Sequence, residues 1–365
     1  MQVNPGLEGV VVAETAISHI DGQQGHLIYR GYDAKQLATT STFEKVVHLL
    51  WKGHFPDGEE EKQWLVKCRQ SQTLSDEMIR LIQTIPERID MLSTLRSVLV
   101  TMENPDWPPT WEQAIRVLVQ VPIIIAARYR YLHHKPIVPP RDDLSFAANY
   151  LYMLRGDEAS EAHVKGLEAY LILTAEHGFN ASTFTSRVVT STESDILSAV
   201  VAAIGALKGR IHGGAPSEVD DMLGEIGSIE RAESWMREKL ERGEKLMGFG
   251  HRVYKTTDPR AEALRTVVQE YAANEPWFDF AVQVEQIALQ LLKEYKPHRS
   301  IYTNVEFYTA AVLKAIQLPA ELYTPTFVVS RTAGWIAHIL EQASHNRIIR
   351  PDSRYVGPKC AKITK

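Results

Sequence analysis

Signals that start and stop helices recur along this 365-residue chain and constrain its fold more than any other feature. Thr110 and Gln113 have the spacing of a capping box, ahead of an apolar-faced segment that we expect to reach about Arg130. Ser160 precedes a segment whose apolar residues recur at helical spacing, with Gly178 as the stop signal. Because such signals continue toward the C-terminus, the sequence predicts a mostly α-helical protein.

Other helix starts follow the same rules. A capping box at 41–44 precedes an apolar-faced segment that ends at Gly53. The segment 195–209 is apolar nearly all round, which is typical of a helix in the middle of a large helical protein. Further helix starts are expected at Ser228, at Asp258 with Pro259, at Thr303 with Asn304, and at Thr324 with Pro325.

The N-terminal residues break this helical pattern. Residues 10–20 and 26–32 are short, β-rich runs joined by DGQQG, and this arrangement predicts a small β-hairpin. Candidate domain boundaries are the prolines that follow Lys135 and Lys296 and the glycines of residues 209–214.

Composition argues against several function classes. Forty basic and forty-five acidic side chains give a net charge of -5, so there is no general basic field for nucleic acid or an anionic membrane. The most apolar window, residues 117–127, is about half as long as a membrane span requires. Cys68 and Cys360 form neither a disulfide framework nor a metal-binding motif. We expect a cytoplasmic protein that binds neither nucleic acid nor membrane.

Three histidines lie beside glycines at expected helix ends or turns: His177, His212 and His251. A neighbouring glycine lets the backbone turn and lets a ligand approach closely. An exposed imidazole at a helix end would produce the same pattern in any single case. A zinc site is a further alternative, but no pair has the spacing of HExxH or of a comparable motif, so no metal is expected.

The stretch GFGHRVYKTTDPR favours a local anion site. Backbone amides at Gly248 and Gly250, together with Arg252 and Lys255, suit a phosphate group, and Arg260 at a helix start suits a carboxylate. Cations on a solvated face are the alternative interpretation. The two glycines also begin a dinucleotide-binding fingerprint, but its third glycine is missing and the preceding segment is expected to be helical.

Five motifs in one order make the chain resemble citrate synthase, in the short form that includes 2-methylcitrate synthases. They are HGGAPSE at 212–218, MGFGHRVYKTTDPRA at 247–261, TNVEFYTAAV at 303–312, SRTAGWIAH at 330–338 and RPDSRYVG at 350–357. The string GFGHRVYKxxDPR is highly specific, and the resemblance extends from GLEGVVVAETAISHIDG to the last motif. We expect no additional regulatory segment of the larger bacterial form.

The resemblance implies a mostly helical, two-domain fold and a homodimer. Residues 209–311 would form the small domain, and residues 1–208 and 312–365 the large one. Oxaloacetate and an acyl-CoA would bind between them, without a separate cofactor. Arg350 is expected to reach across the dimer interface.

The resemblance also implies roles for individual residues. The catalytic residues would be His212, which donates a hydrogen bond to the thioester oxygen while neutral, His251, which polarises the ketone, and Glu306, the base. The implied oxaloacetate-binding residues are His177, Arg260, Arg331 and Arg350. The implied CoA-binding residues are Leu246, Met247, Gly248, Gly250, Arg252, Lys255 and Asn304.

Glu306 departs from the aspartate usual in the family motif NVDxxS. The added methylene moves the carboxylate by roughly an ångström, a displacement that can cost about a hundredfold in rate. Its expected place in a first helical turn favours the charged carboxylate.

The implied reaction condenses acetyl-CoA with oxaloacetate and hydrolyses the citryl-CoA intermediate to citrate and CoA. Synthesis of 2-methylcitrate from propionyl-CoA stays open, because one methylene in an apolar site is worth only about 1–3 kcal/mol. The sequence also leaves open a non-catalytic protein that binds CoA or a dicarboxylate, and a metal hydrolase.

Overall fold

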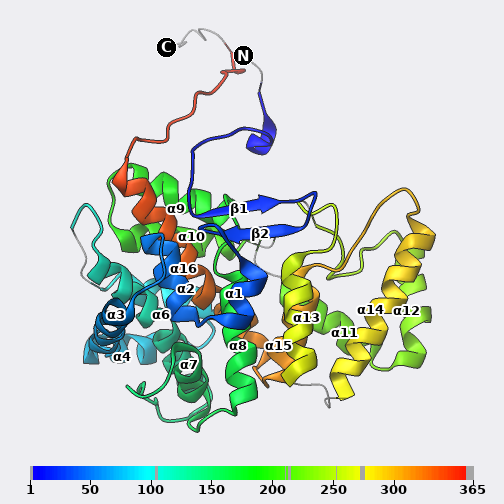
Figure 1. The fold of residues 1–365 in the computed structure, drawn as a ribbon, viewed down its shortest axis with the longest axis horizontal. Helices are drawn as coiled ribbons and strands as arrows, with labels where there is room; N and C mark the ends of the chain where they lie inside the picture. The colour runs from blue at the N-terminus through cyan, green and yellow to red at the C-terminus, as the bar shows by residue number, and fades with distance from the viewer. Residues whose placement is uncertain are drawn as a thin grey trace, which may run out of the picture.

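The computed structural model describes residues 3–102, 106–209, 211–212, 215–251, 253–271 and 276–358, and most of these residues are helical, as predicted. Figure 1 shows the arrangement of the elements. The first helices are α1 (Ala34–Thr40), α2 (Phe43–Lys52), α3 (Gly58–Gln70), α4 (Asp76–Thr84), α5 (Met91–Leu99), α6 (Trp111–Leu132), α7 (Phe146–Arg155) and α8 (Glu161–Thr174). The later helices are α9 (Ala181–Ser191), α10 (Ile196–Leu207), α11 (Ala215–Ile226), α12 (Ile229–Glu241), α13 (Pro259–Tyr271), α14 (Pro276–Tyr295), α15 (Val305–Ala315) and α16 (Tyr323–Ser344). Short 3-10 turns occur at η1 (Pro5–Leu7) and η2 (Ala320–Leu322).

The predicted N-terminal hairpin is present as part of a three-stranded antiparallel sheet. It consists of β1 (Ser18–Asp21) and β2 (His26–Tyr29), and β3 (Tyr32–Asp33) pairs with the other edge of β2. The first strand is shorter than predicted, because β1 already pairs with every residue of β2. Residues 10–17 therefore lie outside the sheet.

The capping residues explain where most helices begin. The capping box at 110–113 is present as predicted, but the one predicted at 41–44 is not. Thr42 caps α2 instead, and Glu44 accepts a hydrogen bond from the backbone of Phe146 at 2.7 Å. Glu44 thus connects α2 to α7, which a local motif cannot reveal.

Helix α16 lies in the centre of the large helical body. It contacts α2, α6, α8, α9 and α10, and most of its side chains are buried. Trp51 in α2 donates a hydrogen bond from Nε1 to the backbone oxygen of Ala333 at 2.8 Å. The helix begins at Tyr323, slightly before the predicted start, because η2 leads directly into it.

Gly334 allows α16 to approach the segment that follows α8. A Cβ at Gly334 would lie 2.2 Å from the backbone oxygen of Ala175 and 2.6 Å from Oε2 of Glu176. We expect Gly334→Ala to lower the free energy of unfolding by about 1–3 kcal/mol through overpacking. Gly224→Ala, at an exposed position of helix α11, meets no described atom within 4 Å and should raise the free energy of unfolding by up to about 1 kcal/mol. Urea unfolding measures both changes, and changes of the same sign would contradict this account.

A second group of helices lies to the right in Figure 1, apart from α2 to α7. Helix α12 packs against α14, while α11, α13 and α14 contact α15. Helix α13 also contacts α1, α8 and β2, so it connects this group to the large helical body. The division into domains at 209–311 stays a prediction.

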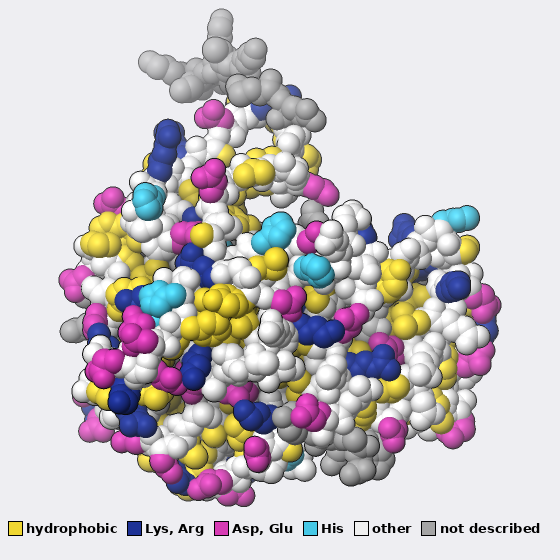
Figure 2. Space-filling view, in the orientation of Figure 1, with side chains coloured by type: hydrophobic (Ala, Val, Ile, Leu, Met, Phe, Trp, Pro, Cys, Tyr) yellow, Lys and Arg dark blue, Asp and Glu magenta, His cyan; other side chains and the backbone are white. Residues whose placement is uncertain are grey.

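The surface agrees with the charge balance of the sequence. Acidic and basic side chains are interspersed over the face shown in Figure 2. Within the parts of the chain that the structure describes, no helix is both long and apolar enough to cross a membrane.

Candidate active site

Two of the predicted histidines face one another. His177, which follows α8, and His251, which precedes α13, have ring centroids 5.5 Å apart at an interplanar angle of 86°. Tyr254 packs against both rings, and its hydroxyl lies 3.2 Å from Nε2 of His177. Burial in this cluster, followed by the charge of Arg260, lowers the pKa of His177 well below its usual range.

His251 is held in one tautomer by its own loop. Its Nδ1 accepts hydrogen bonds from the backbone N–H groups of Val253 and Tyr254 at 3.0 and 3.1 Å, so a neutral ring carries its proton on Nε2. Burial and then Arg260 lower the pKa of His251 to about 4. Nη2 of Arg260, also a donor, lies 3.4 Å from Nε2. Two donors therefore converge where an acceptor oxygen of a ligand would be stabilised.

Asp258 holds Arg260 in place beside His251. Its carboxylate accepts hydrogen bonds from the backbone N–H, Nε and Nη2 of Arg260 at 3.0, 3.0 and 2.8 Å. It also accepts one from the backbone N–H of Val305, the first residue of α15, at 3.1 Å. Asp258 thus joins the loop before α13 to the helix that carries Glu306.

Glu306 is a partly buried carboxylate at the start of α15. Asn304 caps this helix by accepting a hydrogen bond from the backbone N–H of Glu306 at 3.0 Å. Burial raises the pKa of Glu306 to about 7, although Arg260 and Arg331 oppose the rise. Burial of the carboxylate therefore outweighs the preference for the charged form that was expected from the helix start.

The predicted glycine turn is joined to the segment before α15. Gly250 donates its N–H to the backbone oxygen of Tyr302 at 2.7 Å, and Nδ2 of Asn304 donates to the backbone oxygen of Gly250 at 2.9 Å. Gly248 has φ +85°, and a Cβ on it would lie 2.9 Å from Cβ of Phe307. The two glycines and Asn304 therefore form one structural unit beside Glu306.

The other predicted CoA-binding residues have different surroundings. Leu246 is a buried core residue, Met247 is half-buried, and Lys255 is exposed. Lys255 donates its backbone N–H to Gly22 of the hairpin turn at 2.8 Å. Arg252 lies outside the described residues.

His212 is oriented by the beginning of α9. Ser182 lies in the first turn of this helix, and its backbone N–H and hydroxyl approach Nε2 of His212 at 3.3 and 2.9 Å. A backbone N–H can only donate, so Nε2 accepts and Nδ1 carries the ring proton. Burial and then Arg331 lower the pKa of His212, which favours the neutral ring.

Arg331 connects these groups electrostatically from α16. It is buried, donates from Nε to the backbone oxygen of Thr174 at 2.8 Å, and stacks over the ring of Phe327. Its positive charge acts to lower the pKa values of His177, His212 and Glu306. The structure therefore brings these residues into one neighbourhood with His251 and Arg260.

Arg350 lies elsewhere in the subunit. It lines a cavity of about 900 Å³ between the N-terminal segment, represented by Leu7 and Val12, and the end of α16 at Glu341. Figure 1 shows both terminal segments leaving the same side of the helical body. Arg350 is thus the one described oxaloacetate-binding candidate that lines a separate cavity.

Sequence reasoning missed the residues that hold the site in place. Ser182 fixes the tautomer of His212, and the sequence marks Asp258 only as a helix cap. Glu176, next to His177, accepts hydrogen bonds from Ser18 at 2.9 Å and from Nε2 of His338 at 3.1 Å. The position of Glu176 beside the predicted histidine is the only local signal.

The chain is similar to known proteins over nearly its whole length. The sequence model described as "Citrate synthase, C-terminal domain" matches residues 6–352. The chain is 38% identical over 378 residues to a citrate synthase from Haloferax volcanii, covering 100% of this chain and 98% of that protein. It is 39% identical over 363 residues to a 2-methylcitrate synthase from Mycobacterium tuberculosis, covering 97% and 91%.

The fold is shared with a solved structure. A citrate synthase from Thermoplasma acidophilum, solved as a ternary complex with carboxymethyl coenzyme A and oxaloacetate, matches with a TM-score of 0.90 and 28% identity. That match covers 100% of this chain and 98% of the solved chain. The chain therefore belongs to the citrate synthase family.

Proposed function

We propose that this protein condenses acetyl-CoA with oxaloacetate and then hydrolyses the thioester, which yields citrate and free CoA. The main support is that burial shifts the pKa values of the site residues in opposite directions. It raises the pKa of Glu306 to about 7 and lowers those of His251 and His212, which keeps these histidines neutral. Groups with such tuned pKa values are suited to general acid–base catalysis near neutral pH.

Glu306 takes a proton from the methyl group of acetyl-CoA in this reaction. The electrons move onto the thioester oxygen, where the Nδ1–H of His212 stabilises the developing enolate. A donor of this kind is worth about 2.7–4 kcal/mol of barrier in other enzymes. Ser182 matters because its backbone N–H occupies the lone pair of Nε2 and so keeps the ring proton of His212 on Nδ1.

The nucleophilic carbon then attacks the ketone carbon of oxaloacetate. The Nε2–H of His251 polarises the ketone oxygen and supplies its proton as the new carbon–carbon bond forms. Arg260 and Arg331 bind the carboxylates, and His177 contributes another polar contact. Water finally adds to the thioester carbonyl, the carbon–sulfur bond breaks, and CoA leaves as the thiol.

A second candidate is 2-methylcitrate synthesis from propionyl-CoA. The 2-methylcitrate synthase from M. tuberculosis is as similar to this chain as the H. volcanii citrate synthase, with 39% and 38% identity. In addition, Glu306 changes the length of the acid that faces the acyl group. Both reactions use the same catalytic residues.

Release of free thiol tests this proposal. We expect acetyl-CoA to yield thiol only when oxaloacetate is present, at a rate proportional to enzyme concentration. Parallel assays with propionyl-CoA measure the acyl preference. Thiol release that is independent of oxaloacetate, or ligand binding without any thiol release, would contradict the condensation reaction.

The homodimer and the role of Arg350 belong to this proposal. Val11, Tyr355 and Val356 are 87%, 72% and 86% exposed on the two terminal segments, which suits burial by a second subunit. Arg350 would then serve the partner's oxaloacetate site. Light scattering of the active preparation should give twice the mass of the 41.2 kDa chain, and a fully active monomer would contradict this part. The cytoplasmic location stays a prediction.

A further inference from the structure

We propose that the turn between α2 and α3 binds a divalent metal ion of the Zn²⁺ class through His48, His54 and Glu60. Each residue offers one ligand atom, and the three atoms lie within 4.8 Å of one another. The residues come from the last turns of α2, the connecting turn and the first turn of α3. None of them belongs to the proposed condensation site.

His48 is the fixed ligand of this metal site. Its side chain is buried, with a relative exposure of 3%, and its Nδ1 donates a hydrogen bond to the backbone oxygen of His54 at 3.0 Å. A carbonyl oxygen only accepts, so the proton is on Nδ1 and the lone pair is on Nε2. The described residues provide no hydrogen-bond partner for that Nε2. Metal-binding histidines commonly have this arrangement, in which the second ring nitrogen is held by a carbonyl oxygen.

His54 and Glu60 are the adjustable ligands. Nε2 of His54 lies 3.3 Å from both carboxylate oxygens of Glu60. In a tetrahedral zinc site, ligand atoms about 2.0–2.1 Å from the ion are roughly 3.3 Å from each other. The two side chains are 56% and 39% exposed, so they can move toward His48 without disturbing the core.

Glu60 is also held by the helix that carries it. Its Oε2 accepts a hydrogen bond from the backbone N–H of Asp57 at 3.2 Å, as part of a capping box. This contact and the helix start keep the carboxylate near the turn. If Glu60 only paired with His54, the two would form an exposed ion pair worth about 0–1 kcal/mol. Such an ion pair would give no role to the lone pair on Nε2 of His48.

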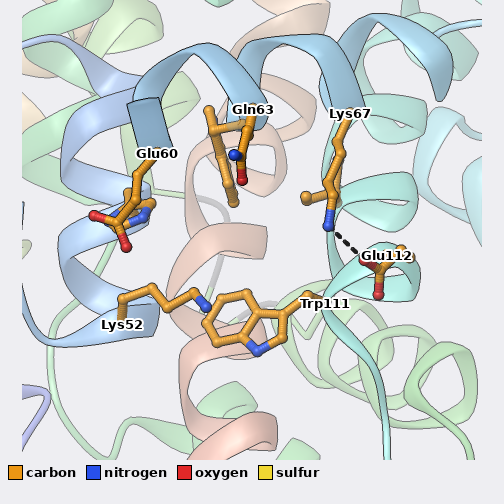
Figure 3. Close-up of a pocket in the computed structure, with 9 residues that line it drawn as sticks. Lys52, Glu60, Gln63, Lys67, Trp111 and Glu112 are labelled. Carbon is orange, nitrogen blue, oxygen red and sulfur yellow. Dashed lines mark hydrogen bonds and ion pairs between the residues drawn. The ribbon is translucent and has the colours of Figure 1, made fainter. Parts of the chain in front are cut away.

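The two lysines near the proposed metal site are each engaged with another side chain. His48 and Glu60 line a cavity of about 160 Å³, which is also lined by Lys52, Lys67 and Trp111. Figure 3 shows Lys52 extending toward Trp111 and away from Glu60, and its Nζ lies 4.1 Å from the centre of that ring. Lys67 is paired with Glu112 at 2.6 Å. Water can occupy the remaining coordination position from the cavity.

Zinc titration of the full-length, untagged protein tests this site after chelator treatment. We expect isothermal titration calorimetry to show one Zn²⁺ per chain, and the melting temperature to rise with zinc. His54→Ala and Glu60→Gln should each weaken binding at least about tenfold. The glutamine preserves the capping box, so its effect reports on the lost carboxylate. Both changes are at the surface and leave the buried His48 in place.

His133→Ala is the matched control. His133 and Glu321 form a pair with the same 3.3 Å separation and with 40% and 57% exposure, but they belong to no three-ligand group among the described residues. Zinc binding by His133→Ala should equal that of the unchanged protein. The proposal is overturned if the unchanged protein binds no zinc, or if zinc binding survives undiminished in His54→Ala and Glu60→Gln. The proposal is equally overturned if His133→Ala weakens zinc binding as much as His54→Ala and Glu60→Gln do.

Discussion

Glu306→Gln is expected to lower kcat by about 10²–10⁴, the usual contribution of a general base. Glutamine has nearly the same shape as glutamate but cannot take a proton from the acyl methyl group. Oxaloacetate-dependent thiol release measures this loss. Glu306→Asp is the matched control, because it keeps the carboxylate and restores the length usual in the family. We expect Glu306→Asp to be far more active than Glu306→Gln, and equal activity of the two would exclude Glu306 as the base.

The same change is expected to make the folded protein more stable at alkaline pH. Burial raises the pKa of folded Glu306 to about 7 from an ordinary value near 4.5, so ionisation costs stability as pH rises through 7. Glutamine never ionises, and the free energy of unfolding should therefore increase by roughly 1–3 kcal/mol at pH 8. Near pH 4 the variant and the unchanged protein should have the same free energy of unfolding. A variant that is inactive and more stable cannot owe its inactivity to misfolding.

The dependence of kcat/KM on pH should identify the same carboxylate. The acid limb is expected near pH 7, since Glu306 must lose its proton to act as a base. The active-site histidines cannot produce this limb, because burial lowers the pKa of His251 to about 4 and also lowers those of His177 and His212. An acid limb near pH 4 would instead mean that Glu306 remains as acidic as an exposed carboxylate.

Local sequence patterns predicted the helices well, because helix starts depend on short-range chemistry. The capping box at 110–113 and the cap at Asn304 require only residues within one helical turn. The glycines beside His251 were also visible as a turn, and Gly248 and Gly250 both have positive φ values. The family resemblance then connected segments that no local pattern could join.

Long-range contacts explain what the sequence did not reveal. Local helix electrostatics predicted a charged Glu306, whereas burial by residues from other segments favours the protonated form. Glu44 was expected to complete a capping box but contacts α7 instead. The metal-ligand group escaped detection because His48, His54 and Glu60 match no short metal motif, although a turn brings them together.

Asp258→Asn is expected to lower the free energy of unfolding by about 3–5 kcal/mol and to abolish most activity. Asp258 and Arg260 form a buried ion pair, with side chains that are 1% and 5% exposed. Burial alone would raise the pKa of Asp258, but the charge of Arg260 lowers it overall. Asparagine leaves Arg260 as a buried charge without its counterion, which is strongly destabilising. Urea unfolding near neutral pH measures this loss.

Glu112→Gln provides the control for charge removal in general. Glu112 pairs with Lys67 at 2.6 Å, but the two side chains are 65% and 46% exposed, so the loss should be about 0–1 kcal/mol. Comparable losses in Asp258→Asn and Glu112→Gln would mean that burial of the Asp258–Arg260 pair has little energetic importance.

The double variant Asp258→Asn with Arg260→Met separates stability from activity. Removing both charges eliminates the uncompensated guanidinium, so the double variant should be more stable than Asp258→Asn alone. Its activity should nevertheless stay low, because the proposed carboxylate ligand beside His251 is gone. If the second substitution restored activity together with stability, Arg260 would serve only the fold. If stability did not recover, the hydrogen bond from Val305 to Asp258 would be the more important contact.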